Sequence, residues 1–362
     1  MEMDFAELQE IVSFCLDEIV RLKQENEALT KRVQELTEMN QNIIETEKVL
    51  ISKTGQAFEN MEILRHVMNR EIDNLFYELN DPGLDRNQVY YPAFYDLDDT
   101  LHMLITERKS MARFGDGEFS IMSNMNRHKF QHPDSKLSER LKEVITSTED
   151  NLLIAIADNY GSLQQYNEDG KQGIRAYMTG EVREQHGKYL DLERKYHNAY
   201  ISRPYALYAD NRTDAPAKRF QKLKGIWERR NVIIVEGALS RLGVGNDLFD
   251  NVLSVKRIEA PPTNSFDKYD DILVACLQHA SEDDLFLIAL GPAAGVLAYD
   301  LTLQNYQAID IGHIDLEYEW FLRGTGGRCE VKNKYNNEVQ GGELVEEVMD
   351  QSYMNEVICV IE

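Results

Sequence analysis

The sequence is poor in cysteine, and it lacks any long apolar run. Its 362 residues include four cysteines (Cys15, Cys276, Cys329 and Cys359), which are far apart and form no C-x-x-C pair. This spacing argues against a disulfide framework or a cysteine zinc site, and we expect reduced, structural thiols. No stretch approaches 18 uninterrupted apolar residues, which excludes a membrane-spanning helix. The acidic start, MEMDFAELQE, has no apolar signal-peptide segment, so we expect a cytoplasmic protein.

Basic residues are also scarce. The chain has 39 lysines and arginines against 63 acids, which gives a net charge of -24. Such a charge repels nucleic acid and anionic membranes, so we expect neither as a partner. An anionic substrate would need a metal ion or a local cluster of basic side chains. The length and a hydrophobic content of 43% predict about two folding units with a sizeable core.

Residues 1–80 have almost no glycine or proline, but they carry a seven-residue repeat. The d positions are Leu8, Cys15, Leu22, Leu29, Leu36, Ile43 and Leu50, and the a positions are Val12, Ile19, Asn26, Val33, Asn40 and Glu47. Leucine at d, β-branched residues at a and the polar Asn26 and Asn40 favour a parallel, two-stranded coiled coil. One amphipathic helix packed on its own domain is the alternative, but six heptads in strict register exceed what that needs. We therefore expect a homodimer.

The rest of the chain predicts a linker and an α/β domain. Gly55 is expected to interrupt the repeat, and Asp81-Pro82-Gly83 to end the helix. Residues 81–95 read as a linker and 96–362 as one domain. Its short apolar segments are expected to be strands at 111–114, 152–157, 232–235, 255–258, 285–290 and 308–311, with helices near 137–149, 183–200, 214–229, 266–280 and 293–304. This alternation predicts a mostly parallel sheet with helices on both faces.

Two acids follow the first predicted strand, in the sequence Arg113-Phe114-Gly115-Asp116-Gly117-Glu118. In an extended segment, residues i and i+2 point to the same side, so Asp116 and Glu118 could reach one cation. Carboxylate oxygens suit Mg²⁺ or Mn²⁺, which share their remaining positions with water and substrate phosphates. An ordinary acidic turn is the alternative interpretation.

Glycines and polar residues follow the strand near 232–235. The segment 236–247, EGALSRLGVGND, allows tight turns whose backbone N–H groups can bind an anion. Arg241 could bind a diphosphate in bidentate fashion. The spacing is neither G-x-G-x-x-G nor a P-loop, so the usual dinucleotide and ATPase motifs are absent. An ordinary strand-to-helix turn is the alternative interpretation.

Three later strand ends carry further candidates. Asn264 could bind a base or ribose, although capping of the next helix is the more usual role for such a residue. Gly291 and Pro292 precede a predicted helix whose first N–H groups could meet a phosphate. His313 and Asp315 share the i, i+2 spacing of an extended segment, so both could face the site. Taken together, glycine with acidic, basic or amide residues at five strand ends is the layout of a metal-assisted nucleotide-diphosphate site.

The strings RFGDGE, VEGALSRLGVGNDLFD, KRIEAPPTNSFDKYD, ALGPAAGVLAYDL and IDIGHIDLEYEW, in that order, resemble the GT-D type bacterial glycosyltransferases. This family includes enzymes that extend glycans on serine-rich streptococcal adhesins. The resemblance covers roughly residues 100–362 and not the coiled coil. It implies a Rossmann-like α/β fold of the GT-D type, a UDP-sugar donor, with UDP-glucose as the precedent, and Mn²⁺ or Mg²⁺ as the cofactor. One departure is Ala293, which stands where the family commonly has a hydroxyl residue.

The resemblance also assigns residues. It places a D-x-E metal motif on Asp116 and Glu118. We expect the neighbouring Arg113 and Gly115 to bind the nucleotide-sugar. Its nucleotide-sugar segments fall on Gly243, Gly245, Asn246, Asp247, Gly291 and Pro292, and its Lys-Tyr-x-Asn-Glu element falls on Lys334, Tyr335, Asn337 and Glu338.

The implied chemistry is sugar transfer to a hydroxyl of a surface glycan or glycoprotein. Cleavage of the sugar–diphosphate bond develops negative charge on UDP, which a cation and Arg241 can stabilise. An inverting reaction needs a base, for which Glu338 and then Asp315 are the candidates. His313 is a third candidate catalytic residue. A retaining reaction needs none, and the sequence does not choose. The alternatives are a coiled-coil scaffold that recruits partner transferases through a weakly active or silent domain, and a metal-dependent phosphohydrolase.

Overall fold

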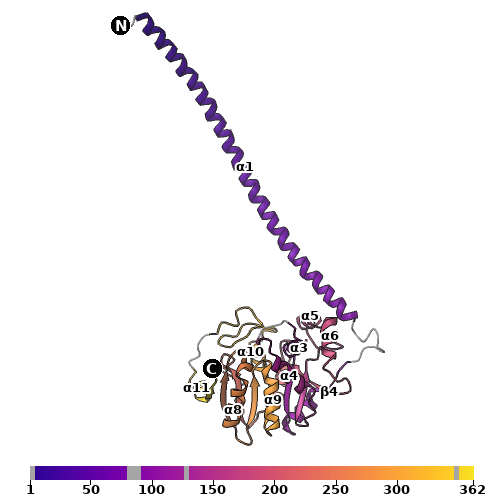
Figure 1. Ribbon diagram of the computed structural model, residues 1–362. Helices are drawn as coiled ribbons and strands as arrows, with labels where there is room; N and C mark the ends of the chain where they lie inside the picture. Colours follow the sequence, from indigo (N-terminus) through magenta and orange to yellow (C-terminus); the bar gives the residue numbers. More distant parts are fainter. Residues whose placement is uncertain (1–4, 80–90, 126–129, 346–349) are drawn as a thin grey trace. The chain divides into compact units, whose positions relative to one another are not determined.

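The computed structural model describes residues 5–79, 91–125, 130–345 and 350–362 (Figure 1). All four cysteines are free thiols, of which Cys276 is buried and Cys15 is exposed. Within the described ranges, no helix is both long and apolar enough to cross a bilayer. The predicted stop at Asp81-Pro82-Gly83 and most of the predicted linker lie outside the described residues.

The chain begins with a single 75-residue helix, α1 (Phe5–Leu79). The expected interruption at Gly55 is wrong, because the helix continues through it. A single glycine costs an exposed helix only about 1 kcal/mol, which its long flanking turns tolerate. The chain divides into two compact units, Met1–Glu71 and Ile72–Glu362, so the end of α1 belongs to the second unit.

The second unit is built on a nine-stranded sheet in the order β1-β4-β3-β2-β8-β7-β5-β6-β9. Every pairing between these strands is parallel, which confirms the predicted α/β sheet. The strands are β1 (Ala93–Phe94), β2 (Ser110–Phe114), β3 (Leu152–Ile156), β4 (Lys195–Asn198), β5 (Asn231–Gly237), β6 (Ser254–Ala260), β7 (Leu285–Ala289), β8 (Gln307–Asp310) and β9 (Val357–Val360).

Helices connect the strands and cover both faces of the sheet. They are α2 (Leu97–Ile105), α3 (Asp116–Met122), α4 (Ser135–Ile145), α5 (Glu168–Tyr177), α6 (Gly180–Gly187), α7 (Ala215–Lys224), α8 (Tyr269–His279), α9 (Ala293–Leu303), α10 (Ile314–Arg323) and α11 (Gln351–Glu356), with 3-10 turns η1 (Ala199–Ser202) and η2 (Ser265–Lys268). On one face, α3, α4, α8 and α9 bury side chains such as Leu141 and Ile272. On the other, α2, α7 and α10 bury Phe220 and Trp320.

The helix predicted over 183–200 is wrong in its second half. Its first residues belong to α6, but Lys195–Asn198 form β4, which pairs with β3. Tyr196 and His197 are buried side by side along this strand, and Thr100 hydrogen-bonds Nδ1 of His197 at 2.8 Å. These tertiary contacts override the helical preference of the preceding segment.

The sheet order places two distant segments together at its centre. β2 lies between β3 and β8, with Met111 in register with Ile309. In the strand order, β3 and β4 lie on one side of β2, and β8, β7 and β5 lie on the other. The direction in which the chain adds strands to the sheet therefore changes between β2 and β8. Ligands of open parallel sheets bind beyond the carboxyl ends of the strands at such a point.

Candidate active site at the carboxyl edge of the sheet

A cleft of about 960 Å³ opens at this edge of the second unit. The loops that follow β2, β3, β4, β5, β7 and β8 contribute to its wall. It is lined by the predicted site residues Arg113, Gly115, Asp116, Glu118, Gly291, Pro292, His313, Asp315 and Glu338. The structure therefore brings these residues into one cavity from segments that are far apart in the sequence.

The two acids of the D-x-E sequence lie in the first turn of α3 and not in an extended segment, so the assumed geometry is wrong. Gly115 is the N-cap, and the Glu118 carboxylate accepts its backbone N–H at 2.7 Å. This bond closes the first helical turn and fixes Glu118, while Asp116 remains exposed in the cleft. Burial, assisted by Asp310, raises the pKa of Glu118 to about 7.

Arg113 is held at the end of β2 by Asp310 at the end of β8. Its guanidinium donates to the Asp310 backbone carbonyl at 2.9 Å and to the Asp310 carboxylate at 2.6 Å. Burial raises the pKa of Asp310, and the charge of Arg113 opposes that rise. Gly312 has a positive φ of 45°, and a Cβ there would overlap the Arg113 guanidinium. The glycine therefore makes room for a cation on the cleft wall.

Arg203 and Glu338 form a second charged pair in the cleft. Nη1 of Arg203 donates to Glu338 at 3.0 Å, and Nη2 also contacts Glu338 and donates to Nδ1 of His313 at 3.2 Å. Because Nδ1 accepts, His313 is neutral with its proton on Nε2, and burial lowers its pKa to about 3. The Glu338 pKa lies well below its usual value, because the Arg203 charge outweighs the effect of burial.

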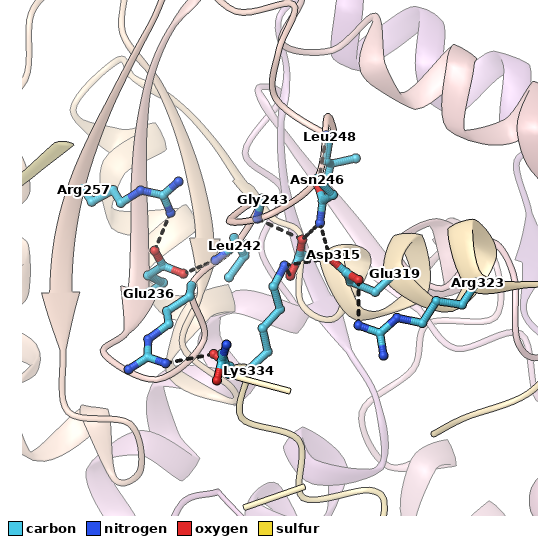
Figure 2. Close-up of polar contacts among 12 residues, drawn as sticks. Glu236, Leu242, Gly243, Asn246, Leu248, Arg257, Asp315, Glu319, Arg323 and Lys334 are labelled. Carbon is cyan, nitrogen blue, oxygen red and sulfur yellow. Dashed lines mark hydrogen bonds and ion pairs between the residues drawn. The ribbon is translucent and has the colours of Figure 1, made fainter. Parts of the chain in front are cut away.

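Asp315 lines the cleft wall but faces a buried polar network, shown in Figure 2. Lys334 donates to Asp315 at 2.6 Å and contacts Glu319 at 3.3 Å. The N–H of Gly243 and the amide of Asn246 also donate to Asp315, at 2.8 and 2.9 Å. We call Gly243, Asn246, Asp315, Glu319 and Lys334 the support network, since it joins the 238–250 loop to α10.

A second buried pair fixes the start of the same loop. Glu236 at the end of β5 pairs with Arg257 of β6 at 2.6 Å, and both are almost fully buried (Figure 2). The other carboxylate oxygen of Glu236 accepts the N–H of Leu242 at 2.7 Å. Burial raises the pKa of Glu236, and Arg257 opposes the rise.

Several predicted binding residues lie outside the residues that line the cleft. Arg241 is buried and donates to the carbonyl of Asn333 at 2.9 Å. Asp247 pairs with Lys224 at 2.9 Å. Asn264 does not line the cleft. It is the N-cap residue of η2, but its side chain makes no capping hydrogen bond and instead accepts the N–H of His132 at 2.8 Å. The other predicted binding residues that do not line the cleft are Gly243, Gly245, Asn246 and Lys334.

The cleft also contains residues that the sequence analysis missed. Arg203 follows β4, and the incorrect helix over 183–200 concealed that strand end. Arg328 lies 3.5 Å from Glu338. Phe130 lies edge-on to Tyr335, with ring centroids 5.7 Å apart, and gives the cleft an aromatic wall. An isolated phenylalanine has no local sequence signal that marks it as a ligand contact.

The fold and the cleft define a class of protein. Residues 111–339 match the family described as glycosyltransferase GT-D fold, and the chain belongs to this family. It is 36% identical over 280 residues to "Probable glycosyl transferase Gly" of Streptococcus gordonii, across 76% of this chain and 40% of that protein. It is 32% identical over 272 residues to "Glycosyltransferase GlyD" of Streptococcus pneumoniae serotype 4, across 73% of this chain and 32% of that protein.

Solved structures show the same relationship. The structure titled "The highly conserved domain of unknown function 1792 has a distinct glycosyltransferase fold" matches with a TM-score of 0.69 and 33% identity, over 75% of this chain and 96% of that one. "A New Glycosyltransferase (DUF1792) from Streptococcus sanguinis" matches with a TM-score of 0.68 and 34% identity, over 75% of this chain and 100% of that one. The chain thus spans the solved domains almost completely, but less than half of the curated relatives.

Proposed function

We propose that the chain transfers a sugar, with glucose as our first candidate, from a UDP-sugar to a hydroxyl of a bacterial surface glycan or glycoprotein. The observation that carries this proposal is the cleft, where Asp116 and Glu118 face the same cavity as Arg113 and Arg203. Acidic groups for a cation and basic groups for a diphosphate are the combination that such a donor requires.

The acids in the cleft fit a divalent cation as a partial ligand set. Among the described residues, no group of three or more His, Cys, Asp or Glu side chains is placed to hold a metal ion. Two carboxylates suffice where the diphosphate and water supply the other oxygens, which is how Mg²⁺ and Mn²⁺ commonly bind. Glu118 supports this, because burial has raised its pKa and a cation would stabilise its ionised form. Asp116 and Glu118 would hold the cation, which would supply charge stabilisation to the leaving diphosphate.

The protein's own residues would bind and orient the donor. Gly291 and Pro292 line the cleft at the start of α9, where the helix dipole favours an anion. Arg113 and Arg203 add positive charge along the wall. Tyr335 and Phe130 offer aromatic surface to a planar base.

The contacts of the two predicted bases favour positioning roles for both. Asp315 is bound by Lys334, Gly243 and Asn246, and Glu338 is ionised but held by Arg203. A carboxylate with a strongly lowered pKa is a weak base. We therefore infer that Glu338 orients Arg203 and His313, and that Asp315 fixes the loop behind the cleft. Either stereochemical outcome remains compatible with this arrangement.

The test is release of UDP from a panel of UDP-sugars by the purified chain, with Mn²⁺ and with EDTA. We expect release from one donor with Mn²⁺, its loss with EDTA and at least a 100-fold reduction in Glu118→Ala, since one charge-stabilising group contributes roughly 3 kcal/mol. Glu228→Ala, which removes an exposed carboxylate on the loop between α7 and β5, is the matched control.

Titration with UDP and Mn²⁺ separates the remaining outcomes. Binding without release indicates that an acceptor is required. If the chain does not bind UDP but binds another transferase tightly, the scaffold function would replace this proposal. Phosphate release without sugar transfer would replace it with a phosphohydrolase.

A further inference from the structure

The first unit presents an apolar stripe that is unpartnered in the single chain. Its members are large, yet each is at least 49% exposed: Val12, Ile19, Leu22, Leu29, Val33, Leu36, Ile43, Leu50, Met61, Leu64 and Met68. All of them fall at a or d positions of one heptad frame along α1. Burying one such side chain contributes roughly 2 kcal/mol, so together they outweigh an association cost of roughly 4–15 kcal/mol.

The continuous helix shows that the frame does not stop at Gly55. Gly55 occupies a b position on the outer side, so it leaves the a and d positions undisturbed. The same frame then places Met61 and Met68 at a and Leu64 at d. Thr54, at an a position, donates its hydroxyl to the carbonyl of Leu50 at 2.7 Å, so the hydroxyl needs no partner in a seam. The frame contains one earlier charge, Glu47 at an a position, and Glu71 is the first charge at a d position.

We infer that α1 pairs with α1 of a second copy of this chain, parallel and in register, along a seam from Val12 to Met68. The seam therefore ends just before Glu71, which is also the last residue of the first unit. This inference rests on α1 alone and is independent of the proposed activity.

Two asparagines favour the parallel orientation. In a parallel pair, Asn26 faces Asn26 of the second copy and Asn40 faces Asn40, so each amide has a hydrogen-bonding partner. In an antiparallel pair, a positions face d positions, and an asparagine would meet an apolar d residue such as Leu29. A buried amide without a partner costs roughly 1–3 kcal/mol.

The flanking positions agree with the same register. In a parallel pair, each g residue lies beside the e residue five positions later in the second copy. This places Glu18 beside Lys23, which have opposite charges. It also places apolar residues together in the pairs Ile11 with Leu16, Met39 with Ile44 and Val67 with Ile72.

The first experiment measures the mass of the full chain by sedimentation equilibrium. We expect twice the chain mass of 41.8 kDa. Leu29→Glu places a charge in the seam while keeping a good helix former, and we expect the dissociation constant to rise roughly 100-fold. Gln24→Glu adds the same charge at the outer f position and should leave it unchanged. A monomer, a trimer, or equal effects of the two variants would overturn the inference.

Cys15 reports orientation, because it occupies a d position near the start of the helix. A parallel, in-register pair places Cys15 beside Cys15, so mild oxidation should give a disulfide-linked dimer that Cys15→Ser abolishes. An antiparallel or staggered pair separates the two thiols by many turns. A dimer of the correct mass without this cross-link would therefore contradict the parallel register.

The extent of the seam is tested in the Cys15→Ser chain. Leu64→Cys puts a thiol at a d position beyond Gly55, and His66→Cys puts one at the outer f position. We expect rapid cross-linking of Leu64→Cys and little of His66→Cys. Equal rates for the two variants would show that pairing stops before Gly55.

Discussion

At the scale of single residues, the second unit depends on charges that are buried in pairs. Lys334 and Asp315 are each 4% exposed at their side chains, and their nitrogen and oxygen lie 2.6 Å apart. A buried charge that loses its partner cannot be compensated by water. Such pairs therefore constrain the wall of the cleft more than they add net stability.

Lys334→Met should lower the free energy of unfolding by about 3–5 kcal/mol, because it leaves Asp315 buried without a cation. Urea denaturation measures this loss. Lys332→Met, on the exposed side chain two residues earlier, should change stability little. Lys334→Met combined with Asp315→Asn should recover part of the loss, and a simple sum of the two single losses would contradict the pairing.

Asp158, which follows β3, gives a pH-dependent prediction. Burial raises its pKa from 3.8 to about 6, so ionisation above that pH opposes folding. Near pH 4 the carboxyl is protonated in the folded chain and the penalty is small. The free energy of unfolding of the wild-type chain then falls as the pH rises from about 4 to 6. Asp158→Asn should therefore raise the free energy of unfolding at pH 7.5 by about 2 kcal/mol. A shift of one pKa unit corresponds to about 1.4 kcal/mol, so the full shift would give a larger value. We expect less because the carboxyl keeps some solvent contact.

Unfolding in urea at several pH values checks this behaviour. The difference between Asp158→Asn and wild type should disappear near pH 4, where both native states carry a neutral side chain. The exposed Asp150→Asn is the control and should show no pH-dependent gain. A gain that is equal at both pH values would mean that burial of the charge is not its cause.

At the scale of elements, turn conformation decides where the polar groups point. The expected i, i+2 geometry failed twice for one reason, because both Asp116-Gly117-Glu118 and His313-Ile314-Asp315 begin helices. The sequence placed these residues at strand ends correctly, but it did not show that the helices start at once. In a helical turn the two acids are displaced around the axis, which a pattern of period two cannot reveal.

Two glycines of the 238–250 loop provide a matched comparison. Gly243 and Gly245 both have positive φ, at 75° and 82°. A Cβ on Gly243 would overlap the ring of Phe249, whereas nothing lies within 4 Å of one on Gly245. Gly245→Ala should cost about 1 kcal/mol from backbone strain, and Gly243→Ala about 1–3 kcal/mol more from overpacking.

Thermal or urea unfolding of both variants measures this difference. Gly243→Ala should also weaken the UDP binding that we propose, since Gly243 donates to Asp315 and holds the loop at the cleft. Equal stability losses in the two variants would show that Phe249 moves aside without cost.

At the scale of the whole molecule, the two units differ in what holds them together. The second unit has its own cores on both faces of a sheet, whereas the first is one helix with its apolar residues exposed. An isolated helix has few interactions beyond its own turns and relies on packing for stability. Its melting should therefore depend on pairing with a second copy.

Two probes can separate these transitions in the full chain. Both tryptophans, Trp227 and Trp320, are fully buried in the second unit, so their fluorescence reports that unit alone. Far-ultraviolet circular dichroism includes α1. We expect a circular dichroism transition whose midpoint rises with protein concentration, and a fluorescence transition that does not change. Coincident, concentration-independent transitions would contradict this separation.

The sequence predicted the class of the fold better than the details of the cleft. Runs such as Leu152–Ile156 are apolar throughout and predict buried parallel strands without any long-range information. The short β1, β4 and β9 were missed, because their pattern is weak and their pairing partners are distant. The sequence correctly predicts that the loops carrying Arg241, Asn246 and Lys334 lie near the cleft. Only the fold reveals that these three side chains turn away from it.

The order of the strands also affects how the protein folds. The pairing of β2 with β8 joins segments such as Ser110 and Ala308, which are 198 residues apart. Closing so long a loop is entropically costly, so contacts of this kind are among the slow steps of folding. Arg113 and Asp310 meet only across this pairing. During synthesis, the central wall of the cleft therefore cannot form until β8 has left the ribosome, and a chain that ends before it can fold parts of the sheet but not the site.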